Sequence, residues 1–410
     1  MAVMMSWSMV NCLGQDALRA SAAGEQSAEF QKATEAPGYY NLQVGPVLLN
    51  FKARMGIEFN DNPSYSQYQR VADVGFRPGA DIGLQWQVND QSRLFFSTGV
   101  DYVEYLRNSY LNHLSVSPDS GLVYHFYVGD FAWELHDRLT VQDTVAQNAA
   151  LGGSLFIQLN NTAGTGVTWD LNKLVFTLKY DHVNSTSLTT NYTYADNSAE
   201  LLNLRSAFLL NPTDKAGVEF GGGSTTYDQD VLQNNTHLSA GLFYEAQLSP
   251  YVSVKISGGY LHYWFDPSSA ANSLAVLGTT NELGSLSSHY ANLSLTHRLN
   301  SRITQTLTAG RQTQAGVSSS ISAIDFVRYS ANWNVAEKLL FSPRVSYERG
   351  TTSGGLSENY DRYGGGFGLG YPLTRKISTT ATYDFFLKNS NVPGFNYYNN
   401  TLVLSMVYSF

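Results

Sequence analysis

The sequence has little charge and almost no cysteine. Of its 410 residues, 14% are charged, whereas an ordinary globular protein has about 25%. The 25 basic and 33 acidic side chains give a formal charge of −8 without any basic run, which excludes the Lys/Arg patch of a nucleic-acid-binding protein. The single cysteine, Cys12, excludes an internal disulfide, a zinc ribbon, an iron–sulfur site and a CxxC redox motif.

Long hydrophobic runs are also missing. No stretch of 18 or more apolar residues occurs, so a transmembrane helix is excluded. The chain is instead rich in small and aromatic residues, with 35 Gly, 27 Tyr and an aromatic content of 13%. A chain that is poor in charge but rich in Tyr and Gly suits a surface with one side in lipid and the other in water.

A period of two residues dominates the chain from residue 47 onward. Within 47–60, the odd positions, such as Leu49 and Phe51, are apolar, and the even positions, such as Lys52 and Arg54, are polar. Because side chains alternate between the two faces of a strand, this pattern predicts one apolar and one polar face. The run is about 14 residues long, which exceeds an ordinary strand and suits a tilted crossing of a bilayer. Around 95–105 the alternation is irregular, which we interpret as a β-bulge.

The links between the predicted strands alternate between short and long. Eight short links with turn residues are predicted near 89–90, 129–130, 172, 211–215, 249–250, 300–301, 336–338 and 374–375. Nine long polar links are predicted near 61–71, 109–118, 147–158, 183–197, 227–235, 265–284, 312–322, 349–358 and 388–397. Short turns at one end and long loops at the other are typical of an outer-membrane barrel.

The predicted fold class is therefore all-β, a single transmembrane antiparallel β-barrel of about 18 strands (range about 16–20), with short periplasmic turns and long extracellular loops. Its location would be the bacterial outer membrane. The last strand ends in an apolar face that includes Tyr408 and Phe410. This ending resembles the C-terminal assembly signal of bacterial outer-membrane proteins, and the resemblance implies recognition by the barrel assembly machinery.

Three segments are predicted along the chain. Residues 1–22 resemble a remnant secretory signal, with a short apolar stretch but no positively charged start. Residues 23–46 are expected to form a flexible periplasmic arm, and residues 47–410 the outer-membrane barrel. Cys12 is not expected to carry a lipid, because no small residue precedes it directly.

The first predicted strand carries a more specific resemblance. The stretch Val44–Pro63, VGPVLLNFKARMGIEFNDNP, opens with Val-Gly-Pro and ends its strand in Phe59-Asn60-Asp61-Asn62. It resembles the opening of the beta-barrel porin 2 family. Some members of that family resemble the outer-membrane partner of exopolysaccharide export systems, so the resemblance implies a conduit of that kind.

Strand parity also predicts which side chains line the barrel interior. These residues are mixed in charge, and Tyr127 and Tyr290 are expected on the same wall. The predicted lumen-lining charges are Lys52, Arg54, Glu58, Glu134, His136, Arg138, Lys173, Lys179, Asp181, Glu245, Lys255, Arg298, Arg328, Arg344, Glu348, Lys376 and Asp384. The predicted loop 265–284 is the longest, and it is therefore the first candidate for a constriction of the lumen.

No catalytic, cofactor-binding or metal-binding residues are predicted, and the chain is not expected to be an enzyme. The eight histidines are scattered without the spacing of a Ser–His triad. His136, between Glu134 and Arg138, fits a charged lumen wall better than it fits a catalytic base.

The leading functional hypothesis is a conduit for exopolysaccharide export across the outer membrane. Its partners would be outer-membrane lipid, the assembly machinery and a periplasmic polysaccharide-export protein. Two alternatives stay open at this stage: a general diffusion porin for small solutes, and a structural or adhesin barrel.

Overall fold

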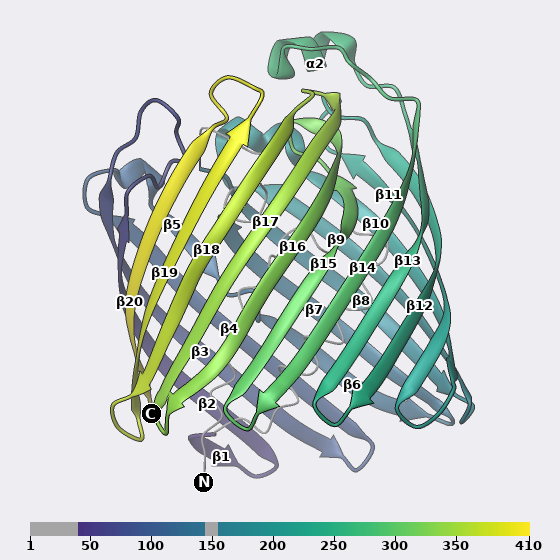
Figure 1. The fold of residues 1–410 in the computed structure, drawn as a ribbon, viewed down its shortest axis with the longest axis vertical. Coiled ribbons are helices and arrows are strands. Elements are labelled where there is room, and N and C mark those ends of the chain that lie inside the picture. The colour runs from purple at the N-terminus through teal and green to yellow at the C-terminus, as the bar shows by residue number, and fades with distance from the viewer. Residues whose placement is uncertain (1–39, 144–154) are drawn as a thin grey trace.

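The protein is a closed antiparallel β-barrel (Figure 1). The structure, a computed structural model, describes residues 40–143 and 155–410. The strands are β1 (Leu42–Val44), β2 (Val47–Asn60), β3 (Asp73–Asn89), β4 (Ser92–Tyr105), β5 (His113–Val116), β6 (Gly121–Val128), β7 (Phe131–Asp143), β8 (Ile157–Asp170), β9 (Leu174–Ser187), β10 (Asn197–Leu209), β11 (Asp214–Tyr227), β12 (Asn235–Ser249), β13 (Val252–Phe265), β14 (Ser285–Asn300), β15 (Ile303–Ala315), β16 (Ser319–Ala336), β17 (Leu339–Gly355), β18 (Asn359–Pro372), β19 (Ile377–Ser390) and β20 (Tyr397–Ser409).

These segments fill 18 positions in the barrel wall. The strands β5 and β6 share one position, because both lie between β4 and β7. The short β1 adds no position of its own, since it pairs only with the first residues of β2. Pairing of β2 with β20, from Lys52↔Ser409 to Asn60↔Thr401, closes the barrel. The predicted fold class and strand number are confirmed.

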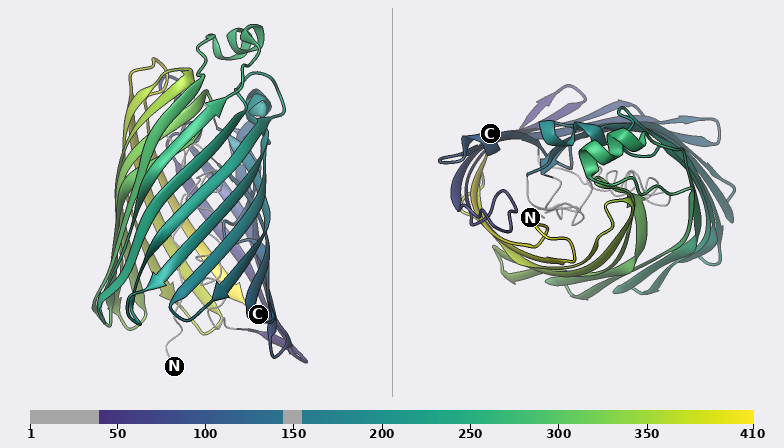
Figure 2. Two further views of the ribbon diagram at one scale, coloured as in Figure 1. Left: turned by 90° about the vertical axis from the view of Figure 1, so that its right-hand side faces the viewer. Right: turned by 90° about the horizontal axis from the view of Figure 1, so that it is seen from above.

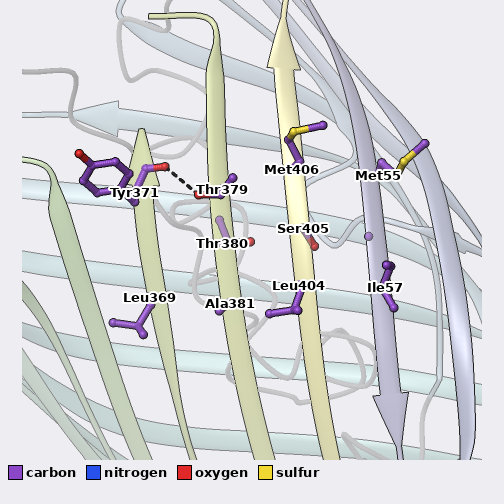
Figure 3. Close-up of a pocket in the computed structure, with 11 residues that line it drawn as sticks. Met55, Ile57, Leu369, Tyr371, Thr379, Thr380, Ala381, Leu404, Ser405 and Met406 are labelled. Carbon is purple, nitrogen blue, oxygen red and sulfur yellow. Dashed lines mark hydrogen bonds between the residues drawn. The ribbon is translucent and has the colours of Figure 1, made fainter. Parts of the chain in front are cut away.

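The apolar face of each strand points outward. At the closing seam, Met55, Ile57, Leu404 and Met406 are 42–49% exposed on the outer surface. They border a shallow groove across β18, β19, β20 and β2, with Ala381 between larger neighbours (Figure 3). A closed barrel with an outward apolar belt leaves no backbone edge unpaired in lipid, which is the architecture of bacterial outer-membrane proteins.

The eight predicted short turns are confirmed. They link consecutive strands through two to four residues, at 90–91, 129–130, 171–173, 210–213, 250–251, 301–302, 337–338 and 373–376. Two of them contain a residue with positive φ, Gly129 at 60° and Asn172 at 66°, as tight turns require. All of these turns lie at the end of the barrel where the chain ends, at the bottom of Figure 1.

Two of the nine predicted long loops are wrong, and most of another, 147–158, lies outside the described residues. The links at 316–318 and 356–358 are only three residues long, because the strands on either side continue almost to the tip. The sequence in these regions is polar and therefore resembles a solvated loop. The 312–322 segment is instead buried inside the barrel, as described below, whereas burial alternates along 349–355 as it does in a strand of the wall.

The predicted bulge around 95–105 is also wrong. The register between β3 and β4 runs without a shift from Gly75↔Tyr105 to Gln87↔Arg93. The alternation looks irregular because Phe95, Val103 and Tyr105 are apolar or aromatic but buried on the inner side. The interruption of regular strand pairing lies in the next strand position of the wall, between β5 and β6.

The segment before the barrel is described only in part. The predicted signal 1–22, Cys12 and residues 23–39 of the predicted arm lie outside the described residues. Within 40–46, β1 pairs with the part of β2 that β20 does not reach, and Asn41 N donates to Leu49 O at 3.0 Å. Phe410 N donates to Phe51 O at 3.3 Å, so both ends of the described chain meet on one edge of β2.

The helical segments lie at the end opposite to the short turns. They are η2 (Ser109–Leu111), η3 (Thr190–Ala195) and α2 (Ala270–Leu277). Ser269 caps the start of α2 and Gly278, with φ of 70°, ends it. The helix sits above the mouth of the barrel (Figures 1 and 2), while Leu277 and Leu283 of the same loop pack against buried clusters at the mouth. A constriction formed by the loop 265–284 stays a prediction. None of the described helices is long and apolar enough to span a membrane.

Candidate functional site

Charged side chains gather in clusters on the inner wall. On β7 and β9, the His136 ring lies between two carboxylates, with Nδ1 at 3.1 Å from Glu134 Oε1 and Nε2 at 2.6 Å from Asp181 Oδ1. Lys179 Nζ lies 3.9 Å from the same Glu134 oxygen. Gly164 on β8 leaves room for this contact, because a Cβ there would lie 2.2 Å from Asp181 Oδ1. The histidine belongs to a charged wall cluster.

A second cluster lies on the first three wall strands. Arg54 Nη2 contacts Asp81 Oδ1 at 3.1 Å and Asp101 Oδ2 at 3.0 Å. Higher on the same wall, Glu58 accepts from Arg77 at 2.9 Å and from the Tyr105 hydroxyl at 2.9 Å. Lys52 lies directly opposite Asp81 in the β2–β3 register.

A third cluster, which contains a deeply buried ion pair, lies on β16 to β19. Glu348 accepts from Arg328 Nη2 at 2.7 Å and from Arg362 Nη2 at 2.6 Å. The side chains of Glu348 and Arg362 are each only 4% exposed. Next to them, the Arg344–Asp384 pair is more open, at 40% and 28% exposure.

The fourth cluster covers β10 to β14. Arg205 Nη2 lies 2.6 Å and Lys215 Nζ 3.0 Å from the carboxylate of Glu245. The Tyr290 hydroxyl donates to Glu219 Oε1 at 2.7 Å. Lys255 is the register partner of Glu245 on β13.

The remaining predicted lumen residues lie near the short-turn end and outside these clusters. Arg298 lies near the end of β14, where its backbone N–H donates to Tyr251 O at 2.7 Å. Lys173 and Lys376 are in the turns 171–173 and 373–376. Tyr127, at the end of β6, is 59% exposed.

The extracellular mouth is narrowed by the tip of the β15–β16 hairpin. In a barrel wall, alternate residues are exposed on the outside, but nearly every residue of 312–322 is buried whatever its parity. Ala315 packs against Val183, Ala199 and Leu201 on β9 and β10. Four strands separate β10 from β15 in the wall, so the hairpin leaves the wall and reaches across the interior. Seen from above, green chain extends into the barrel opening (Figure 2).

An apolar and largely aromatic cluster holds the hairpin tip. Val317, only 2% exposed, packs with residues from loops and strand ends around the mouth: Tyr65, Phe156, Ala195, Tyr227, Leu232 and Tyr397. Ile321 joins a second cluster on the inner face of β13 and β14. Ser320 Oγ also donates to Gln233 Oε1 at 2.9 Å. Burial, with the charge of Asp143 nearby, raises the pKa of Tyr65 well above its ordinary value, so its phenol stays neutral.

Sequence reasoning missed several members of these clusters. Asp81, Asp101, Arg205, Glu219 and Arg362 all share the polar parity of their strands. Parity alone could have identified Arg205 or Arg362. Asp101 was hidden because β4 places apolar residues on its inner face as well.

Comparison with known proteins identifies the fold and no family. No protein-family model and no curated protein matches the sequence. The structure matches a BenF-like porin from Pseudomonas fluorescens Pf-5 with a TM-score of 0.51 and 9% identity, over 90% of this chain and 100% of the porin. OpdK from Pseudomonas aeruginosa gives 0.49 and 13% identity, covering 88% and 99% of the two chains. OccAB3 from Acinetobacter baumannii gives 0.48 and 11%, covering 90% and 100%.

The comparisons overturn the leading functional hypothesis. We expected an exopolysaccharide conduit, but the solved barrel that the structure matches with a TM-score above 0.5 is that of a BenF-like porin. The diffusion-porin alternative fits this finding better, whereas the finer resemblance to the beta-barrel porin 2 family stays a prediction. The chain is a bacterial outer-membrane β-barrel of 18 strands with the fold of a porin.

Proposed function

We propose that the protein is a diffusion porin for small polar solutes. The main support is the wall chemistry: an 18-stranded barrel carries charge clusters of both signs on its inner face and an apolar belt outside. A barrel of this size is wide enough for an aqueous channel. The inward hairpin restricts the channel mouth, which suits small solutes and not polymers.

Solute flux into liposomes tests this proposal. We expect liposomes that contain the purified chain to swell in a pentose or hexose solution and to swell progressively more slowly as the sugar becomes longer. Liposomes without protein are the control. Equal swelling with and without the protein would contradict a porin function and would favour a structural barrel.

Introducing a charge at the hairpin tip should widen the channel. In Val317→Asp, a carboxylate would enter the aromatic cluster, where burial of an unpaired charge costs several kcal/mol. We expect the tip to leave the cluster and single-channel conductance to rise by about a factor of two, as an occluding segment is removed from the pore. Ser318→Asp is the matched control, because Ser318 is only partly buried.

Unchanged conductance of Val317→Asp, with the protein still folded, would show that the hairpin does not limit the channel. A rise of equal size in Ser318→Asp would mean that charge near the mouth, and not displacement of the tip, causes the effect.

A further inference from the structure

The wall is interrupted at one place, between β5 and β6. Residues 117–120, Ser-Pro-Asp-Ser, belong to neither strand, although β4 and β7 flank both. Pro118 has no N–H and cannot donate to a β-ladder. The interruption is sealed at its two ends, because Ser117 N donates to Gly99 O at 2.8 Å and Leu139 N to Ser120 O at 3.3 Å. The wall therefore stays closed while the middle of the segment is displaced.

The displacement is toward the lumen. Gly99 points to the inner side, because a Cβ placed there would lie 2.5 Å from Asp81 Oδ1, 3.0 Å from Arg54 Nη2 and 3.2 Å from Ser117 Cβ. Ser117 thus shares the inner side with the Arg54–Asp81 ion pair.

Two side chains from the neighbouring strands hold the segment from within. Arg138 Nε donates to Pro118 O at 3.1 Å, and Ser97 Oγ donates to Asp119 O at 2.5 Å. The Asp119 N–H bonds Ser117 Oγ at 3.4 Å. Residues 117–120 therefore form a braced inward shelf and not a frayed loop.

Asp119 stands at the middle of this shelf. Asp119 is partly exposed, and its carboxylate repels that of the inward-facing Asp81. Although its backbone is hydrogen-bonded, its side-chain carboxylate has no hydrogen bond or ion pair with residues 40–143 and 155–410. In contrast, Asp81 and Asp101 both bind Arg54. A partly exposed carboxylate without a protein cation can interact with a passing ion.

We infer that the 117–120 shelf is a constriction in the channel and that Asp119 makes it attract cations. This inference rests on the proposed porin function. Charged side chains at a narrow point set the ion selectivity of a pore. The chemistry at the shelf would favour small cations and cationic groups on solutes over anions.

The test compares two carboxylates on neighbouring segments. Asp119→Asn removes the shelf charge, whereas Asp137→Asn removes an exposed carboxylate of β7 that accepts from Asn161 Nδ2 at 2.6 Å. In a KCl gradient across a planar bilayer, we expect Asp119→Asn to lower the cation-to-anion permeability ratio by about a factor of two. Asp137→Asn should leave that ratio unchanged.

Chemical modification of a cysteine at position 119 tests whether this position lies at a narrow point of the channel. In a Cys12→Ser background, which removes the only natural cysteine, Asp119→Cys should lose about half of its conductance when a charged methanethiosulfonate reagent is added. Asp137→Cys should lose none.

The outcomes distinguish a failure of the shelf inference from a failure of the porin proposal. If the wild-type chain conducts but neither Asp119 variant differs from its Asp137 counterpart, the shelf inference is overturned and the porin proposal stands. If the wild-type chain does not conduct at all, both are overturned.

Discussion

Replacing Glu348 by Gln is expected to destabilise the barrel by about 3–5 kcal/mol, the usual cost of breaking a buried ion pair. The Glu348 carboxylate lies between Arg328 and Arg362, and both it and Arg362 are almost fully buried. The neutral amide would leave two guanidinium groups without the charge that they both contact. Refolding into vesicles at graded urea measures the change in unfolding free energy.

The exposed pair on the same wall is the control for this substitution. Asp384→Asn breaks the contact with Arg344, but these side chains are 28% and 40% exposed, and such pairs contribute only about 0–1 kcal/mol. Comparable losses in the two variants would show that burial does not govern the strength of these pairs.

A charge on the outer face is the second substitution with a large expected effect. Leu242 is 67% exposed on the outer surface of β12. Leu242→Arg should cost about 2–4 kcal/mol near the membrane midplane, because arginine must then be held in hydrocarbon. The same urea series in vesicles measures this cost, and Leu242→Met controls for the change of side-chain shape.

The variant compared with Leu242→Arg must place its arginine on the lumen side, at a position where the side chain does not clash. Gly241, the neighbour of Leu242, is unsuitable because a Cβ there would lie 2.1 Å from the Tyr290 hydroxyl. Thr296 shares the parity of Tyr290 on β14 and lies opposite Ser253 and Thr306, so an arginine there meets hydroxyl groups. If Thr296→Arg cost as much as Leu242→Arg, the assignment of inner and outer faces would be wrong.

Local sequence was sufficient to predict most of the fold. Alternation along residues such as Leu49 to Phe59 predicts strand faces because side chains alternate strictly. The short turns at Gly129 and Asn172 follow from the backbone conformation that these residues tolerate. Neither prediction depends on which strands are neighbours.

The side-chain partners could not be predicted in the same way. His136 and Asp181 are 45 positions apart and meet only because of the β7–β8–β9 register. Contacts of this kind depend on strand pairing, and a shift by one residue would turn each side chain to the opposite face.

The inward hairpin illustrates a second limit. Gln312, Thr313 and Gln314 are polar, as in a solvated loop, yet each is less than 9% exposed. Inside a barrel, polar residues can be surrounded by other polar groups of the wall and loops, so polarity does not distinguish a loop in water from one folded into the lumen. The Ser-Pro-Asp-Ser shelf was missed for the same reason, since its composition is that of an ordinary turn.

An aqueous path through the barrel can be detected by recording single-channel currents from the purified protein in a planar bilayer. We expect discrete conductance steps whose size rises with KCl concentration, because ions would cross a wet lumen of mixed charge. Insertion of correctly folded barrels without any current steps would contradict this expectation.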